Sequence, residues 1–449
     1  MEILFGFLIS FCLLIISVLK GMFIGYALIA AWLIFAVISI KKGYTIKEIL
    51  EMSYKGGKQS FVVAKVLLLI GAVIGVWMAS GTIAAIVYYC LKLITPSLFI
   101  FSVFLICCGV SLLIGTSLGS VSMVGLPLMI IARSGNVNLN MTAGTIIAGV
   151  YFGDRCSPMS SSAALIASLT KTNIFTNIKN MLYSSIIPFS LSIVFYYTLS
   201  VLQPLKGMNN NLSNELLGNF KIGFIILLPA IIILILSLCK IKIYFSAPIS
   251  IFVASVFAVI FQHYQFKEVI QFIIFGFQTS KSSPLYNILK GGGIISMLKS
   301  SLVLFVSCSL SGIFKEINVF EGFKKIITYK TLTRQNLFSI TSMVSIITAA
   351  FGCNQTISSV MTNEIMKDCY EDVDKYQFSL DLENSGILIA ALIPWNIAAL
   401  VPTTTLNVNI VGYIPYAFYL YILPIVYFIY SKYSNGNLNI NLNRQEITN

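Results

Sequence analysis

Histidine and charged side chains are scarce in this chain of 449 residues, and each shortage excludes a class of protein. Charged residues make up only 10% of the sequence, against roughly 25% in an average soluble domain, so a soluble fold is excluded. The single histidine, His263, argues against a histidine-based catalytic triad and against a zinc site. The nine cysteines are scattered, with only Cys107 and Cys108 adjacent, and they form neither a metal-ligand spacing nor a disulfide framework.

The chain contains several long apolar runs. The first run leads directly into the second without a small-residue cleavage site, so we expect no cleavable signal peptide. The sequence predicts an all-α polytopic membrane protein in the cell (inner) membrane, with the lipid bilayer as its partner. The runs that approach the roughly 20 residues needed to span a bilayer are Ile3–Leu19, Met22–Ile40, Phe220–Cys239, Ile243–Phe261 and Val411–Tyr430.

The net charge of +13 has two readings. A basic protein can bind nucleic acid, but in a membrane protein the excess of lysine and arginine is typical of cytoplasmic loops. We therefore expect no nucleic-acid partner.

Two pairs of similar stretches occur in the same order along the chain. "KGGKQSFVVAKVLLLIGAVIGVW" from Lys55 resembles "KGGGIISMLKSSLVLFVSCSLSG" from Lys290, and "LLIGTSLGSVSMVG" from Leu112 resembles "TAAFGCNQTISSVM" from Thr348. Internal repeats of this kind are common in secondary transporters. We therefore predict a first transmembrane repeat (1–205), a polar linker (206–218), a second transmembrane repeat (219–431) and a polar C-terminal tail (432–449).

Loop charges predict that the two halves are inverted. The loop Lys41–Lys58 contains five lysines, and its counterpart His263–Gly292 contains three. The next loop reverses this bias, because Gly81–Ser97 has only Lys92 whereas Lys315–Gln335 has five basic residues. By the positive-inside rule, equivalent loops then face opposite sides of the membrane. We expect both termini to be cytoplasmic.

Two segments in each half are too polar and too rich in glycine for plain spanning helices. They are Gly115–Pro127 and Gly149–Leu165 in the first half, and Phe351–Ser359 and Glu383–Asn396 in the second. Irregular backbone at membrane depth is tolerated only where it is buried in protein or lines a water-filled cavity. We therefore predict discontinuous helices at the midplane, whose free backbone groups and hydroxyls replace the water shell of an ion or a polar substrate.

Asp154, in the stretch "GDRCSPMSSS", is the leading candidate for the site. A carboxylate in such a segment is costly and usually functional, and a salt bridge with Arg155 or another cation is the alternative. Arg155 itself either keeps Asp154 ionised, neutralises the site or reaches the membrane interface. The hydroxyl candidates for binding an ion or substrate, whose alternative role is close helix packing, are Thr116, Ser117, Ser157, Ser160 and Ser161.

The second half offers mainly uncharged candidates. Glu383 is a candidate as well, although it ends an acidic stretch with Asp381 that we interpret as an aqueous loop. Glu364 faces either the cavity or solvent, and the sequence leaves both open. The neutral candidates, of which the first three are alternatively helix caps, are Asn354, Gln355, Thr356, Asn384, Ser385 and Asn396.

These segments together resemble the NhaC-type sodium/proton antiporter family. The matching stretches are "IGVWMASGT", "IGTSLGSV", "TAGTIIAGVYFGDRCSPMS", "ENSG" and "LIPWN", in an order and spacing that cover roughly Lys55–Ser168 and Lys290–Pro424. The resemblance implies secondary transport, commonly the exchange of Na⁺ against H⁺. It also implies that some relatives carry organic anions or amino acids.

The chain departs from the family pattern at two acidic positions. The family stretch "GDKxSPLSDTTN" reads "GDRCSPMSSSAA" here, so Ser161 stands at a usual aspartate, and "EDSGT" reads "ENSGI", so Asn384 stands at another. Serine and asparagine do not titrate in the working pH range. Asp154, Glu383 and Glu364 remain as groups able to carry a proton.

We therefore expect a secondary active Na⁺/H⁺ antiporter working by alternating access, with Na⁺ and H⁺ as the transported ions, no further cofactor and no catalytic activity. The alternative is a Na⁺- or H⁺-coupled carrier of a small organic anion or amino acid, which the missing acids and Arg155 favour. An intramembrane hydrolase would need a base near a nucleophile, and His263 falls in a loop. Broken segments in both repeats argue against a passive channel. A homodimer is the candidate assembly.

Overall fold

The computed structural model describes residues 2–205, 211–241, 243–278, 289–317 and 333–433. Within these residues the chain is almost entirely helical, and the strands are the two-residue pair β1 (Phe277–Gln278) and β2 (Lys290–Gly291), which run antiparallel. The predicted all-α fold is confirmed.

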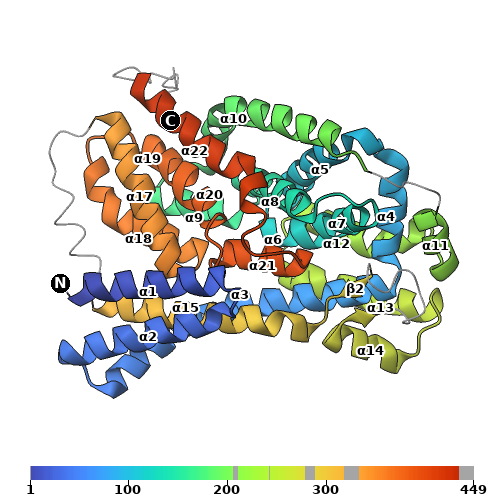
Figure 1. Cartoon of the computed structure of the whole chain (residues 1–449), viewed down its shortest axis with the longest axis horizontal. Coiled ribbons are helices and arrows are strands. Elements are labelled where there is room, and N and C mark those ends of the chain that lie inside the picture. Colours follow the sequence, from blue (N-terminus) through green and yellow to red (C-terminus); the bar gives the residue numbers. More distant parts are fainter. Residues whose placement is uncertain (1, 206–210, 242, 279–288, 318–332, 434–449) are drawn as a thin grey trace, which may run out of the picture.

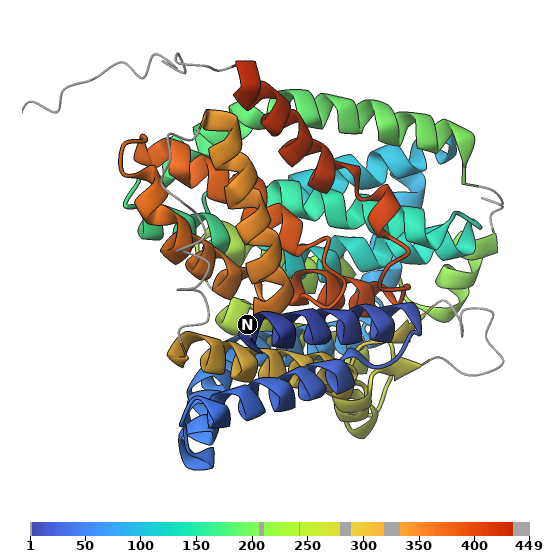
Figure 2. The ribbon, with the colours of Figure 1, turned by 60° about the vertical axis from the view of Figure 1, so that its left-hand side comes forward.

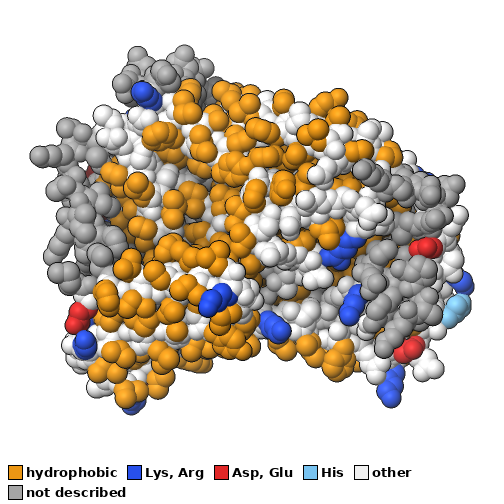
Figure 3. Space-filling model, viewed as in Figure 1, with side chains coloured by type: hydrophobic (Ala, Val, Ile, Leu, Met, Phe, Trp, Pro, Cys, Tyr) orange, Lys and Arg blue, Asp and Glu red, His pale blue; other side chains and the backbone are white. Residues whose placement is uncertain are grey.

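The described residues contain enough long apolar helices for a multi-pass membrane protein. Seven helices are long and apolar enough to cross a bilayer, and an eighth span results if Ser213–Asn219 and Phe224–Leu238, which meet at a bend of 89°, are counted as one. Apolar side chains cover most of the face in Figure 3, and charged ones are sparse on it. This surface is what a protein surrounded by lipid requires.

Four long helices lie side by side as one layer along the lower face in Figures 1 and 2: α1 (Glu2–Leu19), α2 (Ile24–Lys41), α3 (Ile46–Ala79) and α15 (Leu298–Glu316). Helices α3 and α15 approach each other closely where glycine faces glycine. A Cβ on Gly56 would lie 2.7 Å from the Cα of Gly312, so a larger side chain at either position would push the helices apart. Small residues commonly permit such close packing in membranes.

Most of the remaining helices lie above this layer, with α10 and α22 along the upper edge, whereas α13 and α14 pack against α3 at the lower right (Figure 1). In the first half they are α4 (Thr82–Leu93), α5 (Phe99–Ile114), α6 (Ser117–Ser120), α7 (Leu126–Ser134), α8 (Leu139–Cys156), α9 (Ser161–Thr170) and α10 (Ile174–Leu202). Those that follow are α11 (Asn211–Asn219), α12 (Leu228–Leu238), α13 (Ile243–Ile260), α14 (Phe266–Phe275), α17 (Arg334–Gly352), α18 (Gln355–Met366), α19 (Lys375–Leu382), α20 (Leu388–Ala390), α21 (Ile397–Leu406) and α22 (Phe418–Tyr433). Shorter 3₁₀ turns lie at Pro96–Leu98, Phe224–Leu227, Ile294–Met297, Lys367–Tyr370 and Ile414–Tyr416.

The predicted discontinuous helices are confirmed. Helix α5 ends at Gly115 and α17 ends at Cys353, both with left-handed backbone (φ 71° and 48°). Helix α8 ends at Cys156, and α9 begins only after the turn that contains Pro158. In the second half, six residues separate α20 from α21. The structure also contains two π-helical turns, η2 (Val121–Gly125) and η7 (Glu383–Ile387). Placement of the breaks at the membrane midplane stays a prediction.

Several predicted loops are wrong in extent. Most of Lys41–Lys58 belongs to α3, which begins at Ile46 because Thr45 and Glu48 form a capping box. Helix α4 occupies most of Gly81–Ser97, and α14 lies within His263–Gly292. The short helices α4 and α14 were not predicted because loop charge does not mark where a helix begins and ends.

Some boundary predictions fall partly outside the described residues. Most of the predicted loop Lys315–Gln335 is among them, as are residues 206–210 of the predicted linker and 434–449 of the tail. The described part of the linker is helical from Asn211, where α11 begins.

Candidate functional site

The broken segments of both halves meet at a cavity of about 670 Å³. Most of its polar side chains come from the breaks, at the α5–α6 break, the α8–α9 turn and the start of α18, and the apolar first residues of α21 also line it. The opposite wall comes from α3, α12 and α13. Eight of the fourteen residues predicted for the site line the cavity: Thr116, Ser117, Asp154, Ser160, Ser161, Asn354, Gln355 and Thr356.

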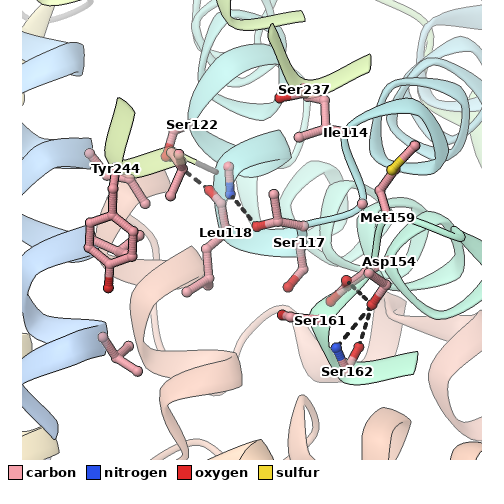
Figure 4. A pocket seen from close by; sticks show the side chains of 18 of the residues that line it. Ile114, Ser117, Leu118, Ser122, Asp154, Met159, Ser161, Ser162, Ser237 and Tyr244 are labelled. Atoms are coloured by element: carbon pink, nitrogen blue, oxygen red, sulfur yellow. Dashed lines mark hydrogen bonds between the residues drawn. The ribbon is translucent and has the colours of Figure 1, made fainter. Parts of the chain in front are cut away.

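Asp154 is placed by the last turn of α8, where that helix packs tightly on α5. A Cβ on Gly153 would lie 2.4 Å from the Cβ of Ser111, so glycine lets the two backbones approach and fixes where Asp154 emerges. Asp154 is 5% exposed, and its Oδ1 accepts a hydrogen bond of 2.9 Å from the Ser160 hydroxyl. Figure 4 shows the carboxylate beside Ser161 and Ser162.

Ser160 connects the carboxylate to the next helix. Its Oγ accepts hydrogen bonds from the backbone N–H groups of Ser162 (3.2 Å) and Ala163 (3.3 Å), which makes it the N-cap of α9. Pro158 has no N–H to continue α8, so the chain turns before α9 begins. The polar stretch after Asp154 is thus a helix break with a cap, and it holds Asp154 at the cavity.

The second half contributes amides and hydroxyls. Asn354 caps α18, its Oδ1 accepting from the N–H of Thr356 at 2.8 Å, so the predicted capping alternative applies to this residue. The side-chain amide of Gln355 donates to the Ile387 carbonyl at 3.2 Å. Among the described residues that line the cavity, Asp154 is the one carboxylate.

The breaks of the two halves match in backbone geometry. Thr116 and Asn354 begin their helices with nearly equal dihedrals (φ −150°, ψ 123° and φ −143°, ψ 129°). Helices α9 and α21 each have ten residues and end at a left-handed residue, Lys171 (φ 53°) and Asn407 (φ 52°). Because α9, α18 and α21 all begin at the cavity, the partial positive charge of three helix N-termini is directed towards it.

The wall formed by α3 carries no polar side chain into the cavity. Val62, Val66 and Ile70 are among its lining residues, and Tyr244 of α13 closes the rim by donating to the Val62 carbonyl at 2.5 Å. Figure 4 shows Tyr244 across the cavity from Asp154. An ion in the cavity therefore finds oxygen ligands on the broken segments.

Six predicted residues do not line the cavity: Arg155, Ser157, Glu383, Asn384, Ser385 and Asn396. Ser157 accepts from the N–H of Met159 within the α8–α9 turn. Asn396 caps α21 and donates to the Ala349 carbonyl at 2.9 Å. Ser385 donates to the Asp381 carbonyl at 2.7 Å, one turn earlier on its own helix.

Arg155 points away from the cavity and into the protein. It is fully buried, and it donates to Ser185 Oγ (2.7 Å), Ser184 Oγ (3.0 Å) and the side-chain oxygen of Asn384. Within the described parts of the chain no carboxylate forms an ion pair with it, so neither the predicted salt bridge with Asp154 nor a position at the membrane interface is found.

The interpretation of Asp381 and Glu383 as part of an aqueous loop is wrong. Both side chains are fully buried. Asp381 pairs with Arg334 and accepts from the hydroxyls of Tyr370 (2.5 Å) and Tyr427 (3.0 Å), which compensates for its burial. Glu364, whose position the sequence left open, is exposed on α18.

Sequence reasoning missed several residues that line the cavity. Tyr151 lies one turn before Asp154 on α8, and its hydroxyl donates to the Ala398 carbonyl at 2.8 Å, which joins the two halves. The three-residue spacing from Asp154 could have identified it. Lys240 and Tyr244 lie at the rim, and the polar interruption "CKIKIY" between two apolar runs was the available signal.

Sequence comparisons relate the chain to known antiporters. The sequence profile of the Na⁺/H⁺ antiporter family matches residues 149–433. The chain is 28% identical over 397 residues to the malate-2H⁺/Na⁺-lactate antiporter of Bacillus subtilis, covering 87% of this chain and 85% of that protein. It is 25% identical over 391 residues to the Na⁺/H⁺ antiporter NhaC of Alkalihalophilus pseudofirmus (85% and 83%), and 24% identical over 397 residues to the arginine/ornithine antiporter ArcD of Halobacterium salinarum (86% and 81%).

Proposed function

Because the chain belongs to the Na⁺/H⁺ antiporter family, we propose that it exchanges Na⁺ for H⁺ by alternating access and binds Na⁺ in the cavity between the broken helices. The observation that carries this proposal is Asp154, a buried carboxylate that lines the cavity and accepts a hydrogen bond from Ser160. Proteins bind hard cations through oxygen atoms, which the broken segments supply. No catalytic step and no bound cofactor enter this proposal.

Within this proposal the cavity residues divide into two groups. Asp154 provides the charge that attracts Na⁺, and the hydroxyls of Ser117 and Ser160 beside it provide further oxygen ligands. The residues that complete the polar lining are Thr116, Ser161, Asn354, Gln355 and Thr356. The backbone matches between the breaks support an origin of the two halves as repeats, and the loop charges are the argument for their inversion.

Reconstituted proteoliposomes test the proposal. A Na⁺ gradient should drive proton movement, followed with a pH-sensitive dye, and Asp154→Asn should abolish it. The exposed carboxylate Glu371 offers a matched control, Glu371→Gln, which should behave as the wild type. Wild-type protein that moves no protons in response to Na⁺, under an imposed gradient of either direction, contradicts the proposal.

A small organic anion is the second candidate substrate. The observation that favours it is the convergence of three helix N-termini on a cavity with one carboxylate, together with the similarity to a malate/lactate antiporter. Counterflow of labelled malate or lactate into proteoliposomes preloaded with the same anion tests it. Counterflow in the absence of Na⁺-driven proton movement would favour this candidate over the first.

We further propose that both termini are cytoplasmic and that the transporter forms a homodimer in the cell membrane. Glu2 and Lys41 lie 3.3 Å apart, so the N-terminus and the basic residues at the end of α2 share one side of the membrane. The positive-inside rule assigns that side to the cytoplasm. Accessibility labelling of single cysteines at positions 43 and 435, on a cysteine-free background, tests both ends, and cross-linking in membranes tests the dimer.

A further inference from the structure

The second buried carboxyl group of the broken segments, Glu383, lies outside the cavity. It begins the π-helical turn η7 and has no exposed surface. Neither of its carboxyl oxygens has a hydrogen-bond partner among the described residues. Burying an ionised carboxylate without partners is costly. Since Glu383 has no hydrogen-bond partner that would offset this cost, its burial calls for another explanation.

Near Glu383 lies a buried cation, Arg155, which forms no ion pair within the described residues. Arg155 donates its hydrogen bonds to neutral acceptors, and one of these, Asn384, follows Glu383 directly in the chain. Arg155 and Asp154 are the charged groups whose electric fields act on Glu383. Arg155 follows Asp154 directly at the end of α8 and is bonded to the residue next to Glu383, so one cation is associated with a carboxyl that lines the cavity and with one that does not.

Other ionisable groups around η7 have partners or lie apart. Asp381 on α19 is neutralised by Arg334 of α17, and Glu364 on α18 is exposed. Helices α9 and α20 carry no ionisable side chain. The remaining ionisable groups that face this region are Cys156 on α8 and the hydroxyls of Tyr419 and Tyr427 on α22, with Tyr419 bonded to Arg155 and Ser185, and Tyr427 bonded to Asp381.

Building on the proposed Na⁺/H⁺ exchange, we propose that Glu383 carries the exchanged proton while Na⁺ binds at Asp154, and that Arg155 between them couples the two sites through charge balance. With both carboxyl groups ionised, the three residues carry one net negative charge. One added cation makes the cluster neutral, and it is either Na⁺ at Asp154 or a proton on Glu383. A low-dielectric interior disfavours both the empty and the doubly occupied cluster, so one ion replaces the other.

The exchange step conserves atoms and charge. As Na⁺ leaves its water shell and binds the Asp154 carboxylate, the O–H bond of Glu383 breaks and its proton passes to water. Glu383 is left as a carboxylate that faces Arg155. In the reverse step a proton from the other side of the membrane protonates Glu383, and Na⁺ dissociates.

Proton release by the purified full-length chain tests this inference. Na⁺ is added to protein in weakly buffered detergent solution, while a pH dye reports protons and calorimetry reports Na⁺ binding. The wild type should release about one proton per Na⁺, and its Na⁺ affinity should rise by up to about tenfold per pH unit. Glu383→Gln has the charge of the protonated acid, so it should bind Na⁺ more weakly than the wild type at high pH, with an affinity independent of pH, and release no proton. Glu364→Gln, which removes an exposed carboxyl, should match the wild type.

The outcomes separate this inference from the proposed function. If Glu383→Gln still releases a proton for each Na⁺, the assignment of the proton to Glu383 is overturned and Na⁺/H⁺ exchange stands. If the wild type binds no Na⁺, the exchange itself fails, and this inference fails with it.

A measurement on the wild type covers the case in which Glu383→Gln does not fold. An apolar carbodiimide modifies protonated carboxyl groups, and peptide mass analysis locates the adduct. Glu383 should be labelled in the absence of Na⁺ and several-fold less when Na⁺ saturates the site. Labelling of Glu383 that Na⁺ leaves unchanged overturns the inference.

Discussion

The breaks of the first half and those of the second half are similar in backbone conformation but differ in the charge of their side chains. In each half the two breaks touch: Gly115 packs on the turn that leads to Ser160, and the Cys353 carbonyl accepts the N–H of Ile397 at 2.9 Å. The breaks of the first half place a carboxylate, Asp154, at the cavity, whereas the breaks of the second half place neutral side chains there. Backbone geometry at such sites is therefore separable from the charge it presents.

The largest expected effect comes from removing the Asp154 carboxylate, the charge that distinguishes the breaks of the first half from those of the second. Asp154→Asn should lower Na⁺ affinity by about 100-fold or more, because breaking a buried charge interaction costs about 3–5 kcal/mol. Calorimetric titration with Na⁺ measures this loss. Asn354→Asp in the same protein, which moves the carboxylate to the matching break, should recover part of the affinity. No recovery in a folded double variant would mean that the two breaks differ in more than charge.

The next effect concerns the left-handed residues that end α5 and α17. A Cβ on Gly115 would meet the Met159 backbone at 2.6 Å at a φ of 71°, so Gly115→Ala should destabilise the protein by about 2–3 kcal/mol. Cys353→Gly removes the strain of a non-glycine residue at φ 48° but also loses a buried side chain, and should be close to neutral. Thermal unfolding in detergent compares the two, and equal losses would contradict the expectation.

The two positions that depart from the family pattern should respond differently to a restored aspartate. Ser161→Asp adds charge to the cavity and should raise Na⁺ affinity by about tenfold, since desolvation offsets much of the Coulomb gain. Asn384→Asp places its carboxylate against buried Arg155, outside the cavity, so it should raise Na⁺ affinity only through the charge balance of the cluster and by less than Ser161→Asp does. Titration of both variants decides this, and the reverse ranking would contradict the cavity described here.

The smallest expected effect is the difference between removing the N-cap of α9, Ser160, and removing the N-cap of α21, Asn396. Ser160→Ala and Asn396→Ala should each cost about 1 kcal/mol of stability, because each removes an N-cap. Ser160→Ala should in addition weaken Na⁺ binding several-fold, because Ser160 donates to Asp154. Asn396→Ala should leave binding unchanged. Comparing unfolding midpoints with Na⁺ titrations tests the difference, and equal Na⁺ affinities in the two variants would count against a role for Ser160 in the site.

The sequence predicted the breaks well because glycine, proline and capping residues act locally. Gly115, Pro158 and Asn354 each determine a chain direction through their own backbone or side chain. The position of Asp154 at the cavity follows from these breaks. Such features can be read without knowing what lies across the molecule.

The sequence could not predict where Arg155 and the second-half acids point, because that depends on tertiary packing. Successive residues on a helix are about 100° apart, so the sequence indicates that Arg155 and Asp154 lie on different faces of α8. It does not indicate that Arg155 contacts α10 and Asn384. Asp381 looked solvated within an acidic stretch, and its burial depends on Arg334, 47 residues away. Long-range pairs of this kind leave no local signal.

The apolar wall of the cavity has a consequence for energy conservation. Protons cross membranes along continuous files of hydrogen-bonded water, and Val62, Val66 and Ile70 offer no side-chain group to anchor such a file. A file of water in the cavity can therefore be held by the polar broken segments but not by the wall of α3. Replacing Val66 by serine should increase passive proton conductance in the absence of Na⁺, which dye measurements on proteoliposomes can detect.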